Sequence, residues 1–79
     1  MPRDSTSNEI VGRVLSEARE NANFTQEELA AQARMDRSYI SDIERGQASL
    51  SVDRLFRICK ALGIRTALVI ERVEEQLQD

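Results

Sequence analysis

Two closely spaced helix-start signals constrain the fold of this chain most. The first is at Thr25, which is followed three residues later by Glu28, the spacing of a capping box. Phe24 precedes the cap and Leu29 stands where a hydrophobic staple needs an apolar partner. These residues predict a short helix over 26–33.

The second start signal is Asp36, a residue type that often caps helix N-termini. It predicts a helix over 37–45, which Gly46 ends. Only the short break at 34–35 separates the two helices. Two short helices joined by a turn of this length form a helix-turn-helix. The inward positions of the second helix are apolar: Ile40 and Ile43.

Apolar residues at three- and four-residue spacing predict three further helices, over 8–22, 52–62 and 67–77. Ser51 and Thr66 are candidate caps for the last two. We therefore expect an all-α fold, a compact bundle of five helices. The domain organisation that follows is a flexible N-terminal arm over 1–7, a helical domain over 8–65 and a C-terminal helix over 66–79.

The C-terminal segment has an alternative interpretation. Its β-branched residues at 66–70 are also compatible with a strand. We favour a helix because strong helix formers follow from Glu71 to Gln78. Its apolar residues cover more than one stripe, so we expect this helix to form a two-fold homodimer interface. The expected interface residues are Leu68, Val69, Ile70, Val73 and Leu77.

The outer face of the helix over 37–45 carries the functional signal. It combines arginines with short hydrogen-bonding side chains: Arg37, Ser38, Ser41, Asp42 and Arg45. Arginine can bond guanine, serine can bond several base edges, and aspartate can accept from the cytosine amino group. Gln26 can bond a phosphate or brace Arg37, and Tyr39 can reach a phosphate. A polar stripe alone is usually solvated surface, so the two-helix frame carries this interpretation.

The chain resembles the Cro/repressor-type helix-turn-helix family, also called XRE-like, over roughly residues 10–65. The segments that carry the resemblance are Phe24 to Ala30, Met35 to Gly46, Leu50 to Leu55 and Ala61 to Ile64. Residues 36–41 are also similar to the recognition helix of restriction–modification controller proteins. The resemblance implies a lambda-repressor-like bundle over 8–65 that binds operator DNA, usually as a dimer.

By position, the resemblance also implies roles for individual residues. It implies base contacts from Arg37, Ser38, Ser41 and Asp42. It implies phosphate or bracing contacts from Gln26, Tyr39 and Arg45. It further implies a partly buried ion pair between Arg19 and Glu44.

The turn departs from the family pattern. Arg34 occupies a position that is usually glycine. If the backbone there is left-handed, the cost is about 1–2 kcal/mol, which a contact elsewhere would offset. The alternative is a slightly different turn.

Composition sets limits on the function. The net charge is −3, but four acidic residues against Arg72 in 71–79 account for all of it, which leaves 1–70 neutral. With no His and one Cys, we expect no metal, no cofactor and no disulfide, and we read Cys59 as a core residue. No catalytic constellation, membrane span or signal peptide is visible. We therefore expect a cytoplasmic non-enzyme without a small-molecule substrate.

The leading hypothesis is a sequence-specific transcriptional regulator, a repressor or autoregulator, that binds palindromic double-stranded operator DNA as a homodimer. The alternative is a helical protein-interaction module, antitoxin-like or an adaptor, with weak or no DNA binding. The acidic balance and Asp42 favour this alternative slightly. The dependence of DNA affinity on salt separates the two.

Overall fold

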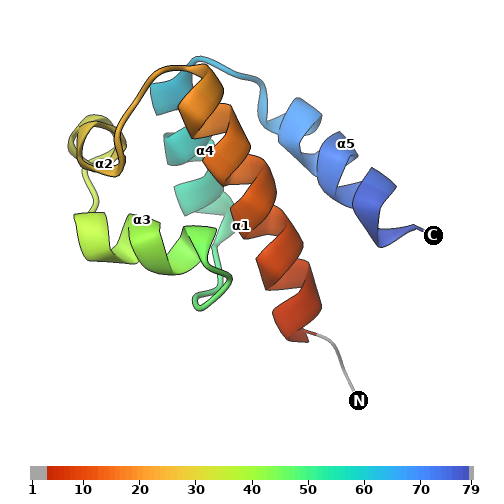
Figure 1. Ribbon diagram of the computed structural model, residues 1–79. Helices are drawn as coiled ribbons and strands as arrows, with labels where there is room; N and C mark the ends of the chain where they lie inside the picture. Colours follow the sequence, from red (N-terminus) through yellow and green to blue (C-terminus); the bar gives the residue numbers. More distant parts are fainter. Residues whose placement is uncertain (1–3, 79) are drawn as a thin grey trace.

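Five helices make up the part of the chain that the computed structural model describes, residues 4–78. They are α1 (Asp4–Asn21), α2 (Gln26–Ala33), α3 (Arg37–Glu44), α4 (Val52–Leu62) and α5 (Thr66–Leu77) (Figure 1). No strand occurs among these residues. The all-α prediction is confirmed, and the strand alternative for 66–70 is wrong. None of the described helices is long and apolar enough to cross a membrane.

The helix ends differ from the predicted ones at four places, one of which is the end of α1 at Asn21 instead of residue 22. α1 begins at Asp4, so the predicted arm is helical over 4–7, while 1–3 lie outside the described residues. The prediction followed apolar periodicity, which a polar first turn does not display. Thr66 is the first residue of α5 and not its cap, a position that Arg65 occupies. α3 ends at Glu44.

Side-chain caps fix the starts of α2 and α4. Thr25 and Glu28 form the predicted capping box: the Glu28 amide donates to Thr25 Oγ1 at 3.0 Å, and the Thr25 amide donates to Glu28 Oε1 at 2.9 Å. Ser51 Oγ accepts from the Arg54 amide at 3.1 Å. Asp36 occupies the N-cap of α3 as predicted, but its side chain makes no capping hydrogen bond.

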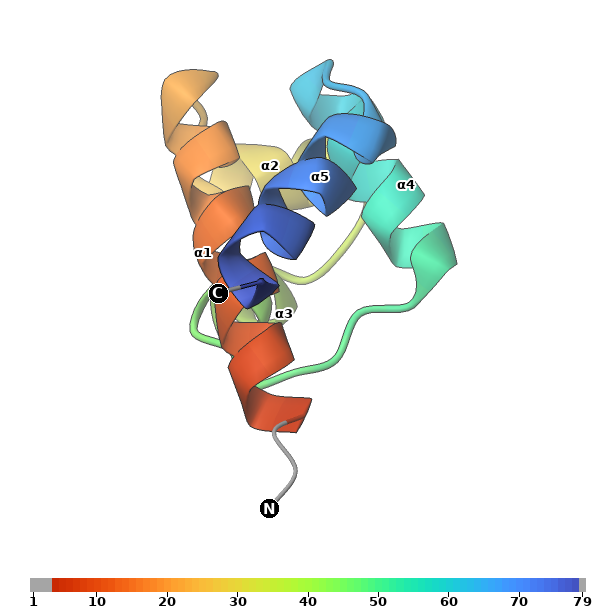
Figure 2. The same cartoon turned by 90° about the vertical axis from the view of Figure 1, so that its right-hand side faces the viewer.

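α1 is the central helix of the bundle. It packs against α3 on one side and α5 on the other, while α2 packs against α3 and α4 (Figures 1 and 2). All five helices contribute to one apolar core. Val69 and Val73 lie in this core, only 2% and 7% exposed. This corrects the expectation that both residues face a partner chain.

The contact between α1 and α3 is unusually close at Gly12. A Cβ atom added at this buried residue would meet the backbone carbonyl oxygen of Ile43 and lie 2.7 Å from that of Glu44. Real Cβ atoms do not approach a carbonyl oxygen so closely. Glycine is therefore required at this position for α1 to cross the end of α3 at the observed distance.

A second contact between the same helices is ionic. Arg19 donates from Nε to Glu44 Oε2 at 2.7 Å and from Nη2 to Glu44 Oε1 at 3.1 Å. Its Nη1 donates to the carbonyl of Phe24 at 2.7 Å, and the side-chain Nε2 of Gln26 donates to Glu44 Oε1 at 2.9 Å. The side chains of Arg19 and Glu44 are only 12% and 6% exposed. The hydrogen bonds to Glu44 raise the pKa of the Arg19 guanidinium, although burial opposes the shift.

The turn between α2 and α3 has a left-handed backbone at Arg34, with φ 60° and ψ 53°, which is the costlier of the two alternatives. Hydrogen bonds from another helix offset the cost of this conformation. Arg57 of α4 donates from Nη2 to the carbonyls of Ala33 and Arg34, at 2.8 and 2.7 Å. These carbonyls end α2, where a cation is favourable.

Replacing Gly12 with alanine should destabilise the bundle. We expect Gly12→Ala to lower the free energy of unfolding by about 3 kcal/mol or more, because α1 and α3 must separate to admit the methyl group. Urea denaturation measures this loss. Gly63→Ala is the control, since its φ of 73° is left-handed but nothing lies within 4 Å of an added Cβ. It should lose about 1–2 kcal/mol. Equal losses for the two variants would refute the close approach.

Removing one partner of the buried ion pair should cost more than removing both. Arg19→Met leaves the buried Glu44 carboxylate without its cationic partner and should lower the free energy of unfolding by about 3 kcal/mol. Glu44→Met should do the same to Arg19, and the double variant should lose less than either single variant. Arg13→Met is the matched control on the same helix, because the hydrogen bond of Arg13 to Gln76 is exposed and long, at 3.4 Å. A loss at Arg19 no larger than at Arg13 would contradict the structure.

Candidate nucleic-acid interface

The outer face of α3 is open to solvent, and its inner face is buried in the core. Ile40 and Ile43 anchor the helix and are 1% and 2% exposed. The structure places all the polar residues predicted for the opposite face there. Those residues are Arg37, Ser38 and Arg45, which are exposed, and Ser41 and Asp42, which are half-buried.

The C-terminal half of this face is one connected unit. Arg45 donates from Nη1 to Ser41 Oγ at 2.8 Å and from Nη2 to Asp42 Oδ1 at 2.6 Å. Both members of the ion pair are accessible, with 61% of the Arg45 side chain and 45% of the Asp42 side chain exposed. Arg45 is therefore not an independent cation, although its predicted role was that of a separate phosphate contact.

Gln26 lies beside α3 but does not brace Arg37. Its side-chain Nε2 donates to the Glu44 carboxylate, which attracts a donor because it is charged and nearly buried. The expected brace on Arg37 is absent from the part of the chain that the structure describes. Gln26 instead joins the start of α2 to the end of α3.

Tyr39 also has a partner inside the chain. Its hydroxyl donates to the carbonyl of Ser49 at 3.1 Å, which ties the loop after α3 back onto the helix. The guanidinium of Arg54 lies 5.2 Å from the centre of its ring, within cation–π range. To donate to a phosphate, the Tyr39 hydroxyl would have to leave Ser49.

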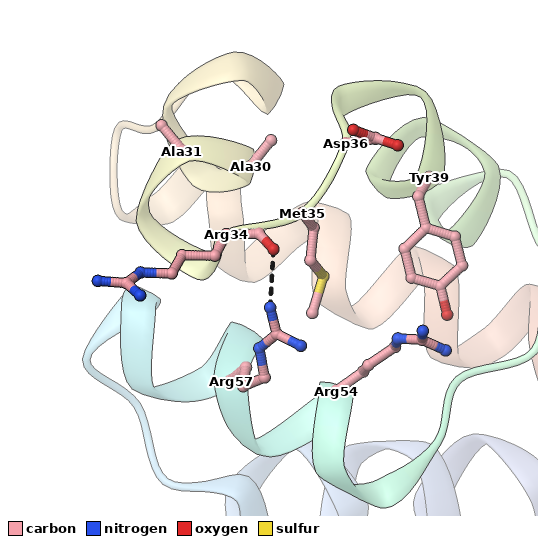
Figure 3. Close-up of a pocket in the computed structure, with 8 residues that line it drawn as sticks. All are labelled: Ala30, Ala31, Arg34, Met35, Asp36, Tyr39, Arg54 and Arg57. Atoms are coloured by element: carbon pink, nitrogen blue, oxygen red, sulfur yellow. Dashed lines mark hydrogen bonds between the residues drawn. The ribbon is translucent and has the colours of Figure 1, made fainter.

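A basic groove of about 590 Å³ lies between the α2–α3 turn and α4 (Figure 3). In the figure, Arg54 and Arg57 reach from α4 toward Met35 and Tyr39, while the Arg34 side chain extends from the turn. The lining residues are Ala30, Ala31, Arg34, Met35, Asp36, Tyr39, Arg54 and Arg57. The basic character of this surface was not predicted from the sequence. The signal was available, since Arg54, Arg57 and Lys60 recur every three residues along α4.

Exposed apolar side chains lie on another part of the molecule, on α4 and α5. Val52 and Ile70 line one small apolar groove of about 220 Å³. Phe56 is one turn from Val52, and Leu77 is seven residues from Ile70 on the same face of α5. Leu68 lines different grooves, together with Ile64. The residues predicted for the dimer interface therefore fall into three groups. Val69 and Val73 lie in the core, Ile70 and Leu77 are exposed near the apolar residues of α4, and Leu68 lies elsewhere on α5.

Cys59 lies in the core, 1% exposed, as expected from its position on α4. Burial raises the pKa of its thiol, and a hydrogen bond with Thr66 partly opposes the shift. A buried thiol held in its neutral form is a poor nucleophile.

Known proteins share both the sequence pattern and the fold. The control protein C.BamHI of Bacillus amyloliquefaciens is 48% identical over 44 residues, which are 56% of this chain and 54% of that protein. The crystal structure of the clp gene regulator ClgR from C. glutamicum is 30% identical, with a TM-score of 0.86 over 98% of this chain and 96% of that chain. The chain spans 54% to 62% of the length of the first curated relatives it matches.

A third match includes DNA. The restriction-modification controller protein C.Esp1396I, solved as a tetramer in complex with its natural 35 base-pair operator, is 30% identical. It superposes with a TM-score of 0.82 over 92% of this chain and 96% of that chain. A family model described as helix-turn-helix matches residues 15–69, which include all of α2 and α3. This match covers more than half of the chain, and the chain belongs to the helix-turn-helix family.

Proposed function

We propose that this chain is a sequence-specific DNA-binding transcriptional regulator that acts as a repressor or autoregulator. The observation that carries the proposal is the division of α3 into two faces. The inner face is fixed by Ile40, Ile43 and the buried Glu44 carboxylate. The outer face is left open and carries side chains that bond base edges in the major groove. A helix held rigidly from behind can place such side chains reproducibly.

Arg37 and Ser38 are the proposed readers at the start of α3, where they are exposed. Around them, Gln26, Arg34 and Arg54 are the proposed phosphate contacts. Arg34 and Arg54 line the basic groove next to the first turn of α3, so their charges can meet the DNA backbone beside the major groove. The relatives support DNA as the ligand, since a controller protein of the same fold is bound to its operator.

An enzymatic activity is not part of the proposal. The outer face of α3 and the adjoining groove present arginines, serines, Tyr39 and two aspartates. The sequence contains no His to act as a general base near neutral pH. Such a surface suits recognition of an anionic partner more than chemistry on a bound substrate.

The proposed active form is a two-fold homodimer. Its interface would combine α4 and α5 through the exposed apolar residues Val52, Phe56, Ile70 and Leu77. A small domain gains apolar burial from such a partner. A dimer would present two copies of α3 to successive major grooves, about 34 Å apart, on a palindromic operator.

DNA binding should weaken steeply as salt rises. We expect the slope of log affinity against log salt for a duplex chosen from a random pool to become shallower by about 1 in Arg54→Ala, which loses one phosphate contact. Fluorescence anisotropy at several salt concentrations measures both slopes. Arg13→Ala is the control, since Arg13 contacts α5, and should leave the slope unchanged. No selected duplex, or affinity independent of salt, would favour the protein-interaction module instead.

A charge at the α4–α5 surface should separate the protomers. Ile70→Asp places a carboxylate in the groove it shares with Val52, and we expect the dissociation constant of the dimer to rise at least about tenfold. Leu68→Asp is the matched control on the same helix, with a similar exposure of 39% against 42%. Sedimentation equilibrium measures both, with circular dichroism to verify folding. If the unmodified chain is monomeric at micromolar concentration, or if Leu68→Asp separates it equally, this interface is wrong.

A further inference from the structure

We propose that Asp42 positions Arg45 and that Arg45 reads a guanine, so that neither residue has the role its position alone predicts. This inference rests on the proposed DNA-binding function. It reassigns the acidic residue from a direct base contact to a support. It also reassigns Arg45 from a sequence-independent phosphate contact to a reader of one base pair.

The geometry of the outer face of α3 supports the reassignment. Arg45 follows Asp42 by three residues and Ser41 by four, so its side chain can fold back along the helix over both. The two hydrogen bonds, 2.6 Å to Asp42 Oδ1 and 2.8 Å to Ser41 Oγ, hold the guanidinium on the face that the proposal directs at base edges. The remaining N–H groups of the guanidinium stay available for guanine O6 and N7.

Charge explains why an acidic residue is tolerated on this face. A lone carboxylate there would be repelled by phosphates. The 2.6 Å pair with Arg45 cancels its charge locally while Arg45 keeps donors for a base. Exclusion of water on binding strengthens the attraction within the pair. The support that Asp42 gives to Arg45 therefore increases when DNA is bound.

Preorganisation adds to the effect. A free arginine loses side-chain freedom when it binds, whereas Arg45 is already restrained by two partners. Within residues 4–78, no side-chain hydrogen bond restrains Arg37, at the other end of the same face. The two arginines are thus distinct readers of two base pairs, and only one of them depends on a neighbouring carboxylate.

Base substitution in a selected duplex tests the proposal. After selection from a random pool, we would measure the affinity of each single base-pair substitution for the unmodified chain, Arg45→Ala, Asp42→Ala and the double variant. Both single variants should lose discrimination at the same G·C pair. The loss should be at least about tenfold for Arg45→Ala, the factor a bidentate contact contributes, and smaller for Asp42→Ala. The double variant should lose no more than Arg45→Ala alone.

Two matched controls sharpen the result. Arg37→Ala should relax a different base pair. Asp42→Asn keeps an oxygen that can accept from Arg45 and should retain more of the preference for guanine than Asp42→Ala does. Folding should be unaffected in all variants, since each changed side chain is at least 45% exposed or lies on the open face.

Replacing that guanine with 7-deazaguanine removes the N7 acceptor and separates the two candidate contacts. The unmodified chain should lose affinity for this duplex, Arg45→Ala should be insensitive, and Asp42→Ala should show a loss between the two. Full sensitivity in Asp42→Ala would mean that Arg45 reads the guanine without support from Asp42, which overturns the proposal. An equal loss of affinity for all duplexes in Arg45→Ala would mean that Arg45 contacts a phosphate and not a base, which also overturns the proposal. If the unmodified chain selects no sequence, the DNA-binding function fails together with this proposal.

Discussion

The buried carboxylate of Glu44 is the point on which the arrangement of the first three helices depends. Glu44 ends α3, Arg19 comes from α1 and Gln26 from the start of α2, and all three meet through hydrogen bonds of 2.7 to 3.1 Å. Arg19 also holds the carbonyl of Phe24. A carboxylate that is 6% exposed would be very unfavourable without these donors. The network therefore fixes the angle at which α3 leaves the bundle, and with it the direction of the open face.

Two smaller features complete this support. Gly12 allows α1 to approach the carbonyl end of α3, and Arg57 of α4 satisfies the carbonyls where α2 ends. Each acts on a helix end, where backbone groups lack partners within the helix. Because its inner face is held by apolar contacts and its C-terminal end by a close contact and an ion pair, α3 can present its outer face without rearranging the core.

Local signals made much of this fold predictable. The capping box at Thr25 and the cap at Ser51 involve neighbouring residues, and both were visible in the sequence. The left-handed backbone at Arg34 was not settled by the sequence, because a non-glycine residue there does not indicate it. The partners of Tyr39 and Arg57 were not, because Ser49 and Ala33 are brought to them by tertiary packing. The apolar pattern of α5 identified a broad face but could not show that Val69 and Val73 turn inward. The predicted contact of Gln26 with Arg37 was wrong for the same reason, because Gln26 bonds Glu44 at the far end of α3.

The distribution of charge on α3 removes the apparent conflict between an acidic chain and an anionic ligand. Its two carboxylates each form an ion pair with an arginine: Glu44 with Arg19, and Asp42 with Arg45. The first pair is buried and the second lies on the open face, so neither leaves an uncompensated negative charge toward DNA. Arg37 then carries the remaining charge of the helix. The acidic excess of the whole chain comes from residues 71–79, of which 71–77 belong to α5, and does not describe the surface of α3. What decides whether such a surface accepts DNA is the local pairing of its charges, because screening by salt limits exposed charges to a range of about 10 Å.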